Sequence, residues 1–212
     1  MAEKVTIGNA ELWHGDCREV LPLLPQFDLI LTDPPYGIGY AAAPVVGKNR
    51  AAATRYAEND WDESAPDMRP FVALGLPAII WGGNYFGLPA SRCWLVWHKP
   101  DYAPSISPVE LAWTSLNKNS GYYRYSCKAT GLERVAAGNP HPTQKPLRLM
   151  EWCLSFAPEA QTVLDPFMGS GTTGVACVRL GKSFVGIERE RKYFDIACER
   201  IENEQRQCRL AV

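Results

Sequence analysis

The sequence predicts an α/β fold in which a doubly wound, mostly parallel sheet carries helices on both faces. Continuous apolar runs, as at 27–32 and 77–81, are typical of strands buried on both faces of such a sheet. Over 162–188 a strand, a glycine-rich turn, a helix, a second strand and an acid follow one another, which is the order of a nucleotide-binding βαβ unit. Because this unit stands near the end of the chain and not at its start, we expect the usual strand order to be circularly permuted.

Length and composition predict a single domain over residues 1–212. The chain has 212 residues, of which 46% are hydrophobic, and this suits one well-buried core without room for a second full domain. No apolar run approaches the roughly 20 residues that cross a bilayer, and the N-terminus lacks the pattern of a signal peptide. We therefore expect a cytoplasmic protein without a membrane partner.

The cysteines and histidines do not indicate a metal site. Seven cysteines are scattered singly, without a C-x-x-C pair, and only three histidines accompany them. Most lie inside apolar patterns, as Cys177 does, where a reduced thiol behaves as a small hydrophobe. Neither a metal nor a disulfide framework is expected.

The net charge of −1 excludes a surface coated with basic residues, but the charges are unevenly distributed. Residues 92–148 hold eight Lys or Arg against three acids, and residues 37–57 hold basic residues without any acid. Such segments can meet a polyanion while the rest of the surface stays neutral or acidic. The candidate contacts are Lys48, Arg50, Arg55, Lys118, Arg124, Lys128 and Arg134.

In the first part of the chain, residues 5–14 alternate weakly and predict one or two short strands. A short helix over 17–24 is curtailed by two prolines. The strand at 27–32 then places Asp33 at its C-terminal end, where open α/β sheets bind ligands. Residues 37–61 show no convincing period, so we predict a mobile loop there, close to the active site.

Helices and strands alternate over the remainder of the chain. The predicted helices are 67–75, 147–156, 172–180 and 190–205, and the predicted strands are 77–81, 93–98, 109–114, 122–127, 162–164 and 183–187. We expect the strands 109–114 and 122–127 to form an antiparallel pair. Pro146 suits the first position of the helix that follows it.

The stretch from Val163 to Thr173 has the composition of a ligand-binding turn. Gly169 and Gly171 let the chain turn sharply from strand into helix and let a ligand approach the main chain. Glu188, at the end of the next strand, is placed to accept hydrogen bonds from ribose hydroxyls. The pattern differs from G-x-G-x-x-G, which disfavours a pyrophosphate cofactor. An acid at position 165 beside backbone donors suits a zwitterionic ligand with an amino acid tail.

Asp33-Pro34-Pro35-Tyr36 is the more specific motif. An exocyclic aromatic amine is a poor nucleophile because its lone pair is delocalised into the ring. A carboxylate from Asp33 and the carbonyl of Pro34, accepting the two N–H bonds, would favour tetrahedral geometry at that nitrogen. The prolines stiffen the turn, and Tyr36 can lie flat against a base.

With these motifs the chain resembles the amino-methyltransferases of DNA, specifically the permuted group called the beta class. The resemblance depends on the order of Asp33–Tyr36, the His-Pro-Thr-Gln-Lys-Pro segment 141–146 and Asp165–Thr173, and it covers nearly the whole chain. Segments 81–86 and 110–114 further resemble the small, often phage-borne or orphan members. The resemblance implies a Rossmann-like, circularly permuted methyltransferase fold.

The resemblance also implies a reaction and a site. The implied activity is site-specific transfer of a methyl group from S-adenosylmethionine to adenine N6 of a base flipped out of DNA. The implied catalytic residues are Asp33, Pro34, Pro35 and Tyr36. The implied cofactor-binding residues are Asp16, Thr143, Lys145, Asp165, Phe167, Gly169, Ser170, Gly171, Thr172 and Glu188. No metal is required, because the amine attacks the sulfonium methyl directly.

Alternatives stay open at this point. Cytosine N4 presents the same amine geometry, and Asp33 favours adenine only by resemblance. RNA or a protein glutamine amide is a less favoured acceptor. The chain could also be a cofactor-dependent DNA-binding module without turnover. Loss of Asp33 or Tyr36 would indicate such a module, and both residues are present. Only a small insertion at about 101–139 and the loop 37–61 are left to recognise the target. This favours a short site, a homodimer or help from another protein.

Overall fold

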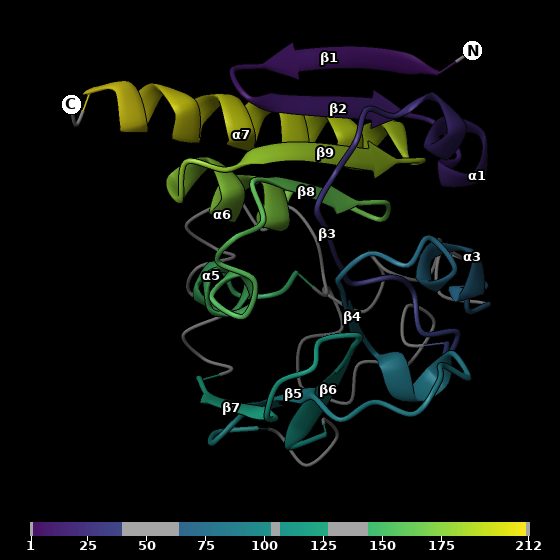
Figure 1. Cartoon of the computed structure of the whole chain (residues 1–212). Coiled ribbons are helices and arrows are strands. Elements are labelled where there is room, and N and C mark those ends of the chain that lie inside the picture. The colour runs from purple at the N-terminus through teal and green to yellow at the C-terminus, as the bar shows by residue number, and fades with distance from the viewer. Residues whose placement is uncertain (1, 40–63, 103–106, 127–143, 211–212) are drawn as a thin grey trace, which may run out of the picture.

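One nine-stranded mixed sheet forms the centre of the computed structural model (Figure 1). The structure describes residues 2–39, 64–102, 107–126 and 144–210. Most of the predicted loop 37–61, and residues 103–106 and 127–139 of the predicted recognition insertion, therefore lie outside the described residues. No helix among the described segments is long and apolar enough to span a bilayer.

The strand order is β1-β2-β9-β8-β3-β4-β6-β5-β7. The strands are β1 (Glu3–Ile7), β2 (Ala10–His14), β3 (Leu29–Thr32), β4 (Ala78–Trp81), β5 (Trp94–His98), β6 (Val109–Thr114), β7 (Gly121–Arg124), β8 (Thr162–Asp165) and β9 (Ser183–Glu188). β1 and β6 run antiparallel to their neighbours, and the other strands share one direction. The late strands β8 and β9 stand between the early strands β2 and β3, so the mostly parallel sheet and its permuted order are confirmed.

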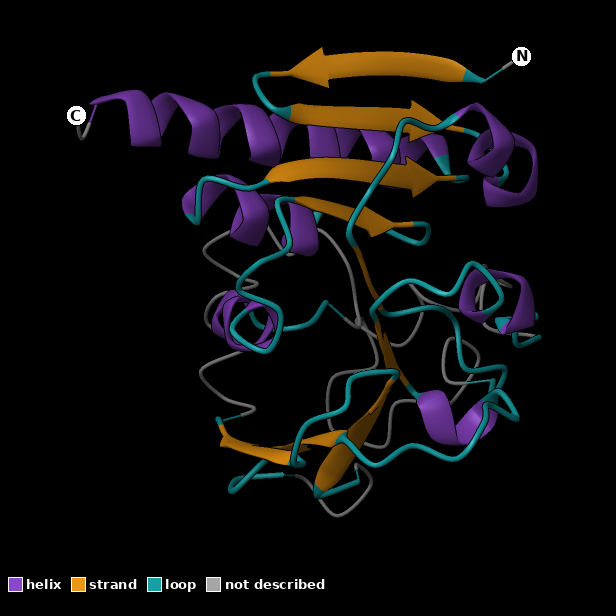
Figure 2. Cartoon of the chain, in the orientation of Figure 1, coloured by secondary structure: helices purple, strands orange, loops and turns teal. Residues whose placement is uncertain are grey.

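Helices cover both faces of this sheet, as Figure 2 shows in purple against the orange strands. The helices are α1 (Cys17–Val20), η1 (Leu21–Leu23), α3 (Arg69–Val72), η3 (Gly83–Tyr85), α5 (Leu147–Leu154), α6 (Thr172–Arg179) and α7 (Arg191–Leu210). Side chains of α5, α6 and α7 share one apolar core, whereas α1 and α3 contribute to a second core on the opposite face. The fold is therefore doubly wound.

The central strands are buried on both sides because their apolar residues are continuous. Leu29 and Leu31 of β3 belong to the core beneath α5, α6 and α7, while Ile30 between them belongs to the other core. β4 repeats this division, with Ile79 facing the first core and Ile80 the second. Because side chains alternate along a strand, successive apolar residues of β3 and β4 fill the two cores in turn.

β6 and β7 do not form the predicted antiparallel pair. β5 lies between them, antiparallel to β6 and parallel to β7. Burial explains the order, because Leu95 and Trp97 of β5 are almost completely inaccessible whereas Tyr122 of β7 is 63% exposed. An exposed aromatic strand suits the edge of the sheet, and the apolar strand takes the inner position. The other predicted elements are present, with α3 shorter and α7 longer than expected.

Candidate active site

The two motifs that stood out in the sequence meet at the C-terminal edge of the sheet. β3 and β8 are parallel neighbours, so Asp33 after β3 and Asp165 at the end of β8 lie close together. The hydroxyl of Thr32 donates to Asp165 Oδ1 at 2.7 Å across 133 positions of sequence. The tetrapeptide and the glycine turn therefore line one common edge, although they are distant in the chain.

Asp165 fastens three elements together at this edge. Its side chain is buried and accepts hydrogen bonds from the hydroxyls of Thr32 at 2.7 Å and Thr173 at 2.6 Å, and from the backbone N–H of Phe167 at 3.1 Å. Burial raises the pKa of Asp165 to about 6, against the effect of those donors. Through these donors the carboxylate connects β3, the turn after β8 and α6.

The glycine turn is held by a second carboxylate, that of Glu188 at the end of β9. Its Oε2 accepts from the backbone N–H of Gly169 at 2.9 Å and its Oε1 from that of Glu190 at 2.8 Å. Burial raises the pKa of Glu188. Gly171 has a φ of +78°, and a Cβ there would lie 2.9 Å from the Cβ of Ala197 in α7. A glycine is therefore required both by the left-handed turn and by the close packing of α7.

Ser170 connects this turn to α7 and to the segment before α5. Arg200 of α7 donates to the Ser170 carbonyl at 2.5 Å and to its hydroxyl oxygen at 2.9 Å, and lies 3.3 Å from the hydroxyl oxygen of Thr172. The Ser170 hydroxyl donates to Gln144 Oε1 at 3.0 Å. Burial lowers the pKa of Arg200 to about 10. Arg200 carries no distinct signal in the sequence, because its place in a charged C-terminal helix resembles an ordinary surface position.

Asp16 begins α1 at the end of β2, beside the same edge. Its Oδ1 accepts from the backbone N–H of Arg18 at 2.9 Å, which makes it the N-cap of the helix. The side chain of Arg18 lowers the pKa of Asp16 to about 2 through hydrogen bonding. Gly15 donates to the backbone carbonyl of Glu188 at 3.0 Å. Asp16 and Glu188 are thus brought to neighbouring strand ends.

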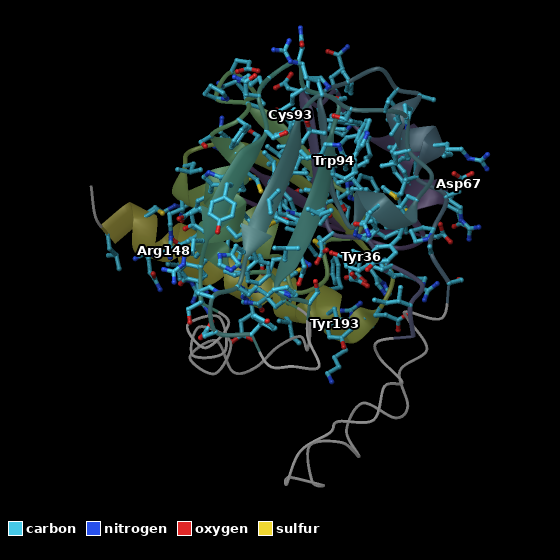
Figure 3. All side chains as sticks on the ribbon, turned by 90° about the horizontal axis from the view of Figure 1, so that it is seen from below. Tyr36, Asp67, Cys93, Trp94, Arg148 and Tyr193 are labelled. Carbon is cyan, nitrogen blue, oxygen red and sulfur yellow. The ribbon has the colours of Figure 1, made fainter. Side chains whose placement is uncertain are left out.

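Asp33 and Tyr36 are joined by an ammonium group from a distant segment. Lys145 Nζ lies 2.7 Å from each carboxylate oxygen of Asp33 and 3.1 Å from the Tyr36 hydroxyl, and that hydroxyl donates to Asp33 Oδ1 at 2.8 Å. Burial raises the pKa of Asp33, and the Lys145 ammonium opposes the rise. In Figure 3 Tyr36 lies well away from Cys93 and Trp94, which stand where β5 begins and mark the opposite edge of the sheet.

Lys145 also contacts a carboxylate that the sequence analysis assigned no role. The Oε2 atom of Glu110, in β6, lies 3.1 Å from Lys145 Nζ. The Oε1 atom of Glu110 pairs with the ammonium of Lys99, which directly follows β5. Although burial works in the other direction, Lys145 and Lys99 together lower the pKa of Glu110. The family resemblance implies a cofactor role for Lys145, whereas the structure places its ammonium on Asp33 and Glu110. A cofactor role for Lys145 stays a prediction.

Tyr36 is set in an aromatic environment that depends on a glycine. Its ring stacks on Tyr85 with centroids 5.2 Å apart and meets the edge of Phe86 at 6.3 Å. Gly82 has a φ of +69°, and a Cβ there would lie 2.1 Å from the Tyr36 ring. The ring can therefore occupy this place only because position 82 carries no side chain. Tyr85 is 47% exposed and is the solvent-facing partner of the stack.

Comparisons with known proteins identify relatives over nearly the whole chain. The family model described as DNA methylase, of the N6/N4 type, matches residues 81–199. The type II methyltransferase M2.DpnII of Streptococcus pneumoniae is 52% identical to the chain over 248 aligned positions, which cover 91% of this chain and 90% of the relative.

The chain belongs to the N6/N4 family of DNA methylases. A second relative, the type II methyltransferase M2.LlaDCHI of Lactococcus lactis subsp. cremoris, is 28% identical over 91% of this methylase and 89% of the relative. Among solved structures, the M1.HpyAVI–SAM complex matches with a TM-score of 0.52 and 26% identity, covering 90% of this chain and 99% of that one. The cytosine-N4-specific PvuII methyltransferase matches with a TM-score of 0.55 at 18% identity, which shows a shared fold.

As a member of this family, the protein is an S-adenosylmethionine-dependent DNA methyltransferase. The glycine turn fits such a cofactor on its own chemistry. α6 begins at Thr172 after Gly171 without a side-chain cap, so an anionic ligand group can satisfy N–H groups of its first turn. Glu188 supplies a carboxylate beside that turn. Acid and free backbone donors together suit a ligand that carries both a carboxylate and hydroxyl or amino groups.

The predicted DNA contacts are only partly covered by the structure. Lys48, Arg50, Arg55, Lys128, Arg134 and the predicted cofactor residue Thr143 lie outside the described residues. Arg124 is exposed and ends β7, on the same edge as Asp33. Lys118 lies in the connection between β6 and β7 at the opposite edge, where its ammonium donates to the carbonyl of Phe156 at 2.6 Å. The structure therefore does not bring Lys118 together with the site.

Proposed function

We propose that this methylase transfers the methyl group of S-adenosylmethionine to the exocyclic N6 of adenine in DNA. The observation that carries the proposal is the carboxylate of Asp33, held by Tyr36 and Lys145 at the edge that also holds the glycine turn. Its side chain is 22% exposed, so a ligand that enters from solvent can reach it. A carboxylate in this position suits an acceptor of N–H hydrogen bonds from an amine.

Three residues of the tetrapeptide have different roles at the target base: Asp33, Pro34 and Tyr36. Asp33 accepts one N–H of the amine, and the carbonyl of Pro34 accepts the other, which favours tetrahedral geometry at the nitrogen. Tyr36 stacks on the base, an interaction worth about 1–3 kcal/mol in nucleic-acid sites. Pro35 keeps the turn stiff so that both acceptors stay aimed. As the N–C bond forms and the S–C bond breaks, the nitrogen loses one proton to solvent or to Asp33.

The cofactor side of the edge is assigned to the glycine turn and its supports. S-adenosylmethionine supplies an electrophilic methyl group on a sulfonium. Glu188 would accept hydrogen bonds from ribose hydroxyls, and uncapped N–H groups in the first turn of α6 would donate to the amino acid tail. Phe167 and Asp16 would flank the adenine ring of the cofactor. Asp165 acts through Thr32 and Thr173, by keeping the turn and β3 together.

The target base leaves the duplex to reach this site. N6 of a paired adenine lies inside the helix and cannot approach a carboxylate at the edge of a sheet, so the nucleotide flips out at a cost of a few kcal/mol. Tyr36 and the exposed ring of Tyr85 offer an aromatic surface at that edge. The described part of the recognition insertion contributes Arg124 to the same edge.

The test is product analysis of DNA methylated by the purified protein. Unmethylated plasmid DNA and tritiated S-adenosylmethionine are incubated with the native protein and with Asp33→Ala, and the DNA is digested to nucleosides. N6-methyladenine from the native protein alone supports the proposal. N4-methylcytosine as the product overturns the adenine assignment. Equal background in both proteins, with cofactor still bound, overturns the enzymatic assignment in favour of a binding module.

A further inference from the structure

A second ion pair lies behind Asp33, and the chemistry proposed above does not use it. Lys145 Nζ contacts Asp33 and, at 3.1 Å, Glu110 Oε2, while Glu110 Oε1 pairs with Lys99. The order is carboxylate, ammonium, carboxylate, ammonium. These residues come from the turn after β3, the segment before α5, β6 and the end of β5, so four separate parts of the chain supply one network.

The two ammonium groups of the network are buried, and its four charges balance. The side chains of Lys145 and Lys99 are 7% and 5% exposed, and those of Asp33 and Glu110 are 22% and 23% exposed. Two cations and two carboxylates cancel, which is how buried charges are tolerated in proteins. An ion pair of Lys145 with Asp33 alone would already be neutral. The additional pair of Glu110 with Lys99 therefore serves some purpose other than neutralising Asp33.

The ammonium of Lys145 competes with the amine that Asp33 is proposed to accept. Both oxygens of Asp33 lie 2.7 Å from Lys145 Nζ, and Oδ1 also accepts from the Tyr36 hydroxyl. A carboxylate offers about four lone-pair positions, and an ammonium bound to both oxygens also withdraws electron density from them. A target amine therefore binds a weakened acceptor unless Lys145 moves away from it.

Glu110 is the acceptor to which Lys145 can move. The distance from Nζ to Glu110 Oε2 is 3.1 Å, against 2.7 Å to each oxygen of Asp33, so the contact with Glu110 has room to shorten. A lysine side chain has rotatable bonds along its whole stem and three ammonium protons, so a small displacement exchanges one carboxylate for the other. The ion pair with Lys99 favours the charged form of Glu110.

We propose that Glu110 is a positioning residue for methyl transfer, which takes over the ammonium of Lys145 as the target amine binds to Asp33. This inference depends on the amine methylation proposed above. Glu110 touches neither the base nor the cofactor and acts through Lys145. Loss of the Glu110 carboxylate leaves Lys145 fixed on Asp33, so the amine meets a blocked acceptor and the transfer step slows.

The experiment compares Glu110→Gln with the double variant Lys99→Met/Glu110→Gln. The single variant leaves the ammonium of Lys99 buried without its carboxylate, and this can impair folding, whereas the double variant restores the balance of charge. Transfer of tritiated methyl groups to unmethylated plasmid DNA gives kcat and KM, and calorimetry gives the affinity for S-adenosylmethionine. We expect kcat to fall about ten-fold or more in both variants, with KM for DNA and cofactor affinity within about three-fold.

A matched control removes another partly buried ion pair. Arg179, at the end of α6 away from the glycine turn, pairs with Glu204 of α7 at 2.7 Å, and the double variant Arg179→Met/Glu204→Gln should keep the native kcat. A native kcat in Lys99→Met/Glu110→Gln overturns the inference. If Glu110→Gln alone is slow and the double variant is not, the Glu110 carboxylate is needed for folding alone. A native protein that methylates cytosine N4 refutes the adenine assignment, while the comparison of kcat values still decides the role of Glu110.

Discussion

The two halves of the active-site edge are built in different ways. In the cofactor half, Asp165 and Glu188 accept hydrogen bonds from neutral hydroxyl and backbone N–H donors, and most of the residues involved lie between 162 and 190. In the amine half, Asp33 and Glu110 are paired with Lys145 and Lys99, which come from separate segments.

This difference separates a rigid support from an adjustable one. Neutral donors fix the direction of the carboxylates of Asp165 and Glu188 but add no opposite charge, whereas at Asp33, where burial also raises the pKa, the Lys145 ammonium opposes that rise. Lysines do add charge and have flexible stems, so the acceptor strength of Asp33 depends on where Lys145 lies. The geometry therefore suits a fixed site for the cofactor beside a site that changes when the target amine arrives.

The largest expected effect is the loss of methyl transfer in Asp33→Ala, which should affect the amine half and leave the cofactor half intact. Removal of a preorganised group that stabilises the reacting atoms costs about a hundred- to thousand-fold in rate, so methyl transfer should fall at least that far. Cofactor affinity should stay within about three-fold, because among the described residues the Asp33 carboxylate bonds to Lys145 and Tyr36 and not to the glycine turn. Filter binding of tritiated S-adenosylmethionine and the transfer assay measure the two quantities. A large loss of cofactor binding would contradict the division into halves.

A smaller effect is expected when Tyr36 is displaced without being mutated. In Gly82→Ala, the new Cβ would lie 2.1 Å from the Tyr36 ring, so the ring must move and transfer should fall about ten-fold or more. Gly75→Ala is the matched control, because Gly75 has a similar φ of +70° and nothing within 4 Å of a Cβ. Both variants carry the backbone strain of a left-handed residue, about 1–3 kcal/mol. Equal activity in the two variants would show that the position of Tyr36 does not matter.

These two halves also differ in how far the sequence predicts them. The cofactor half is local, since a strand, a glycine turn, a helix and an acid succeed one another and one stretch of sequence contains nearly every partner. The sequence therefore predicts its position, its glycines and Glu188. Arg200 escapes prediction, because only the packing of α7 against the turn brings it to Ser170.

The amine half is assembled by topology. Asp33 and Tyr36 form a recognisable motif, but Glu110 and Lys99 reach it only because β6 stands between β4 and β5. No spacing in the sequence encodes that order, and the expected pairing of 109–114 with 122–127 was wrong for the same reason. The pair of glycines at 82 and 83 is a usable sequence signal. Glycine directly after a buried strand indicates the close approach of another side chain, which here is Tyr36.

The pH dependence of stability tests the cofactor half, through Asp165. Burial raises the pKa of Asp165 from 3.8 to about 6 in the folded chain. A carboxyl group with a raised folded pKa stabilises the fold fully below about pH 4 and loses that contribution as the pH rises through about 6. Relative to Asp165→Asn, the native free energy of unfolding should therefore decline by up to about 3 kcal/mol between about pH 4 and about pH 7.

Urea unfolding of both proteins across this range measures the difference, and groups that titrate equally in both cancel. A relative stability that increases with pH would mean that the hydrogen bonds to Asp165 outweigh its burial.

The smallest expected effect concerns one hydrogen bond of Asp165. Thr173→Val keeps the shape of the side chain but removes the hydroxyl that donates to Asp165 Oδ2 at 2.6 Å, so a buried acceptor loses a donor at a cost of about 1–3 kcal/mol. Thr173→Ser keeps the hydroxyl and controls for the loss of a methyl group. Because a hydrogen bond to an ionised carboxylate is the stronger one, the cost in urea unfolding should be larger at about pH 8 than at about pH 5. An equal cost at both pH values would mean that Asp165 keeps one protonation state throughout, and the contrast between the two halves would then rest on Glu188 alone.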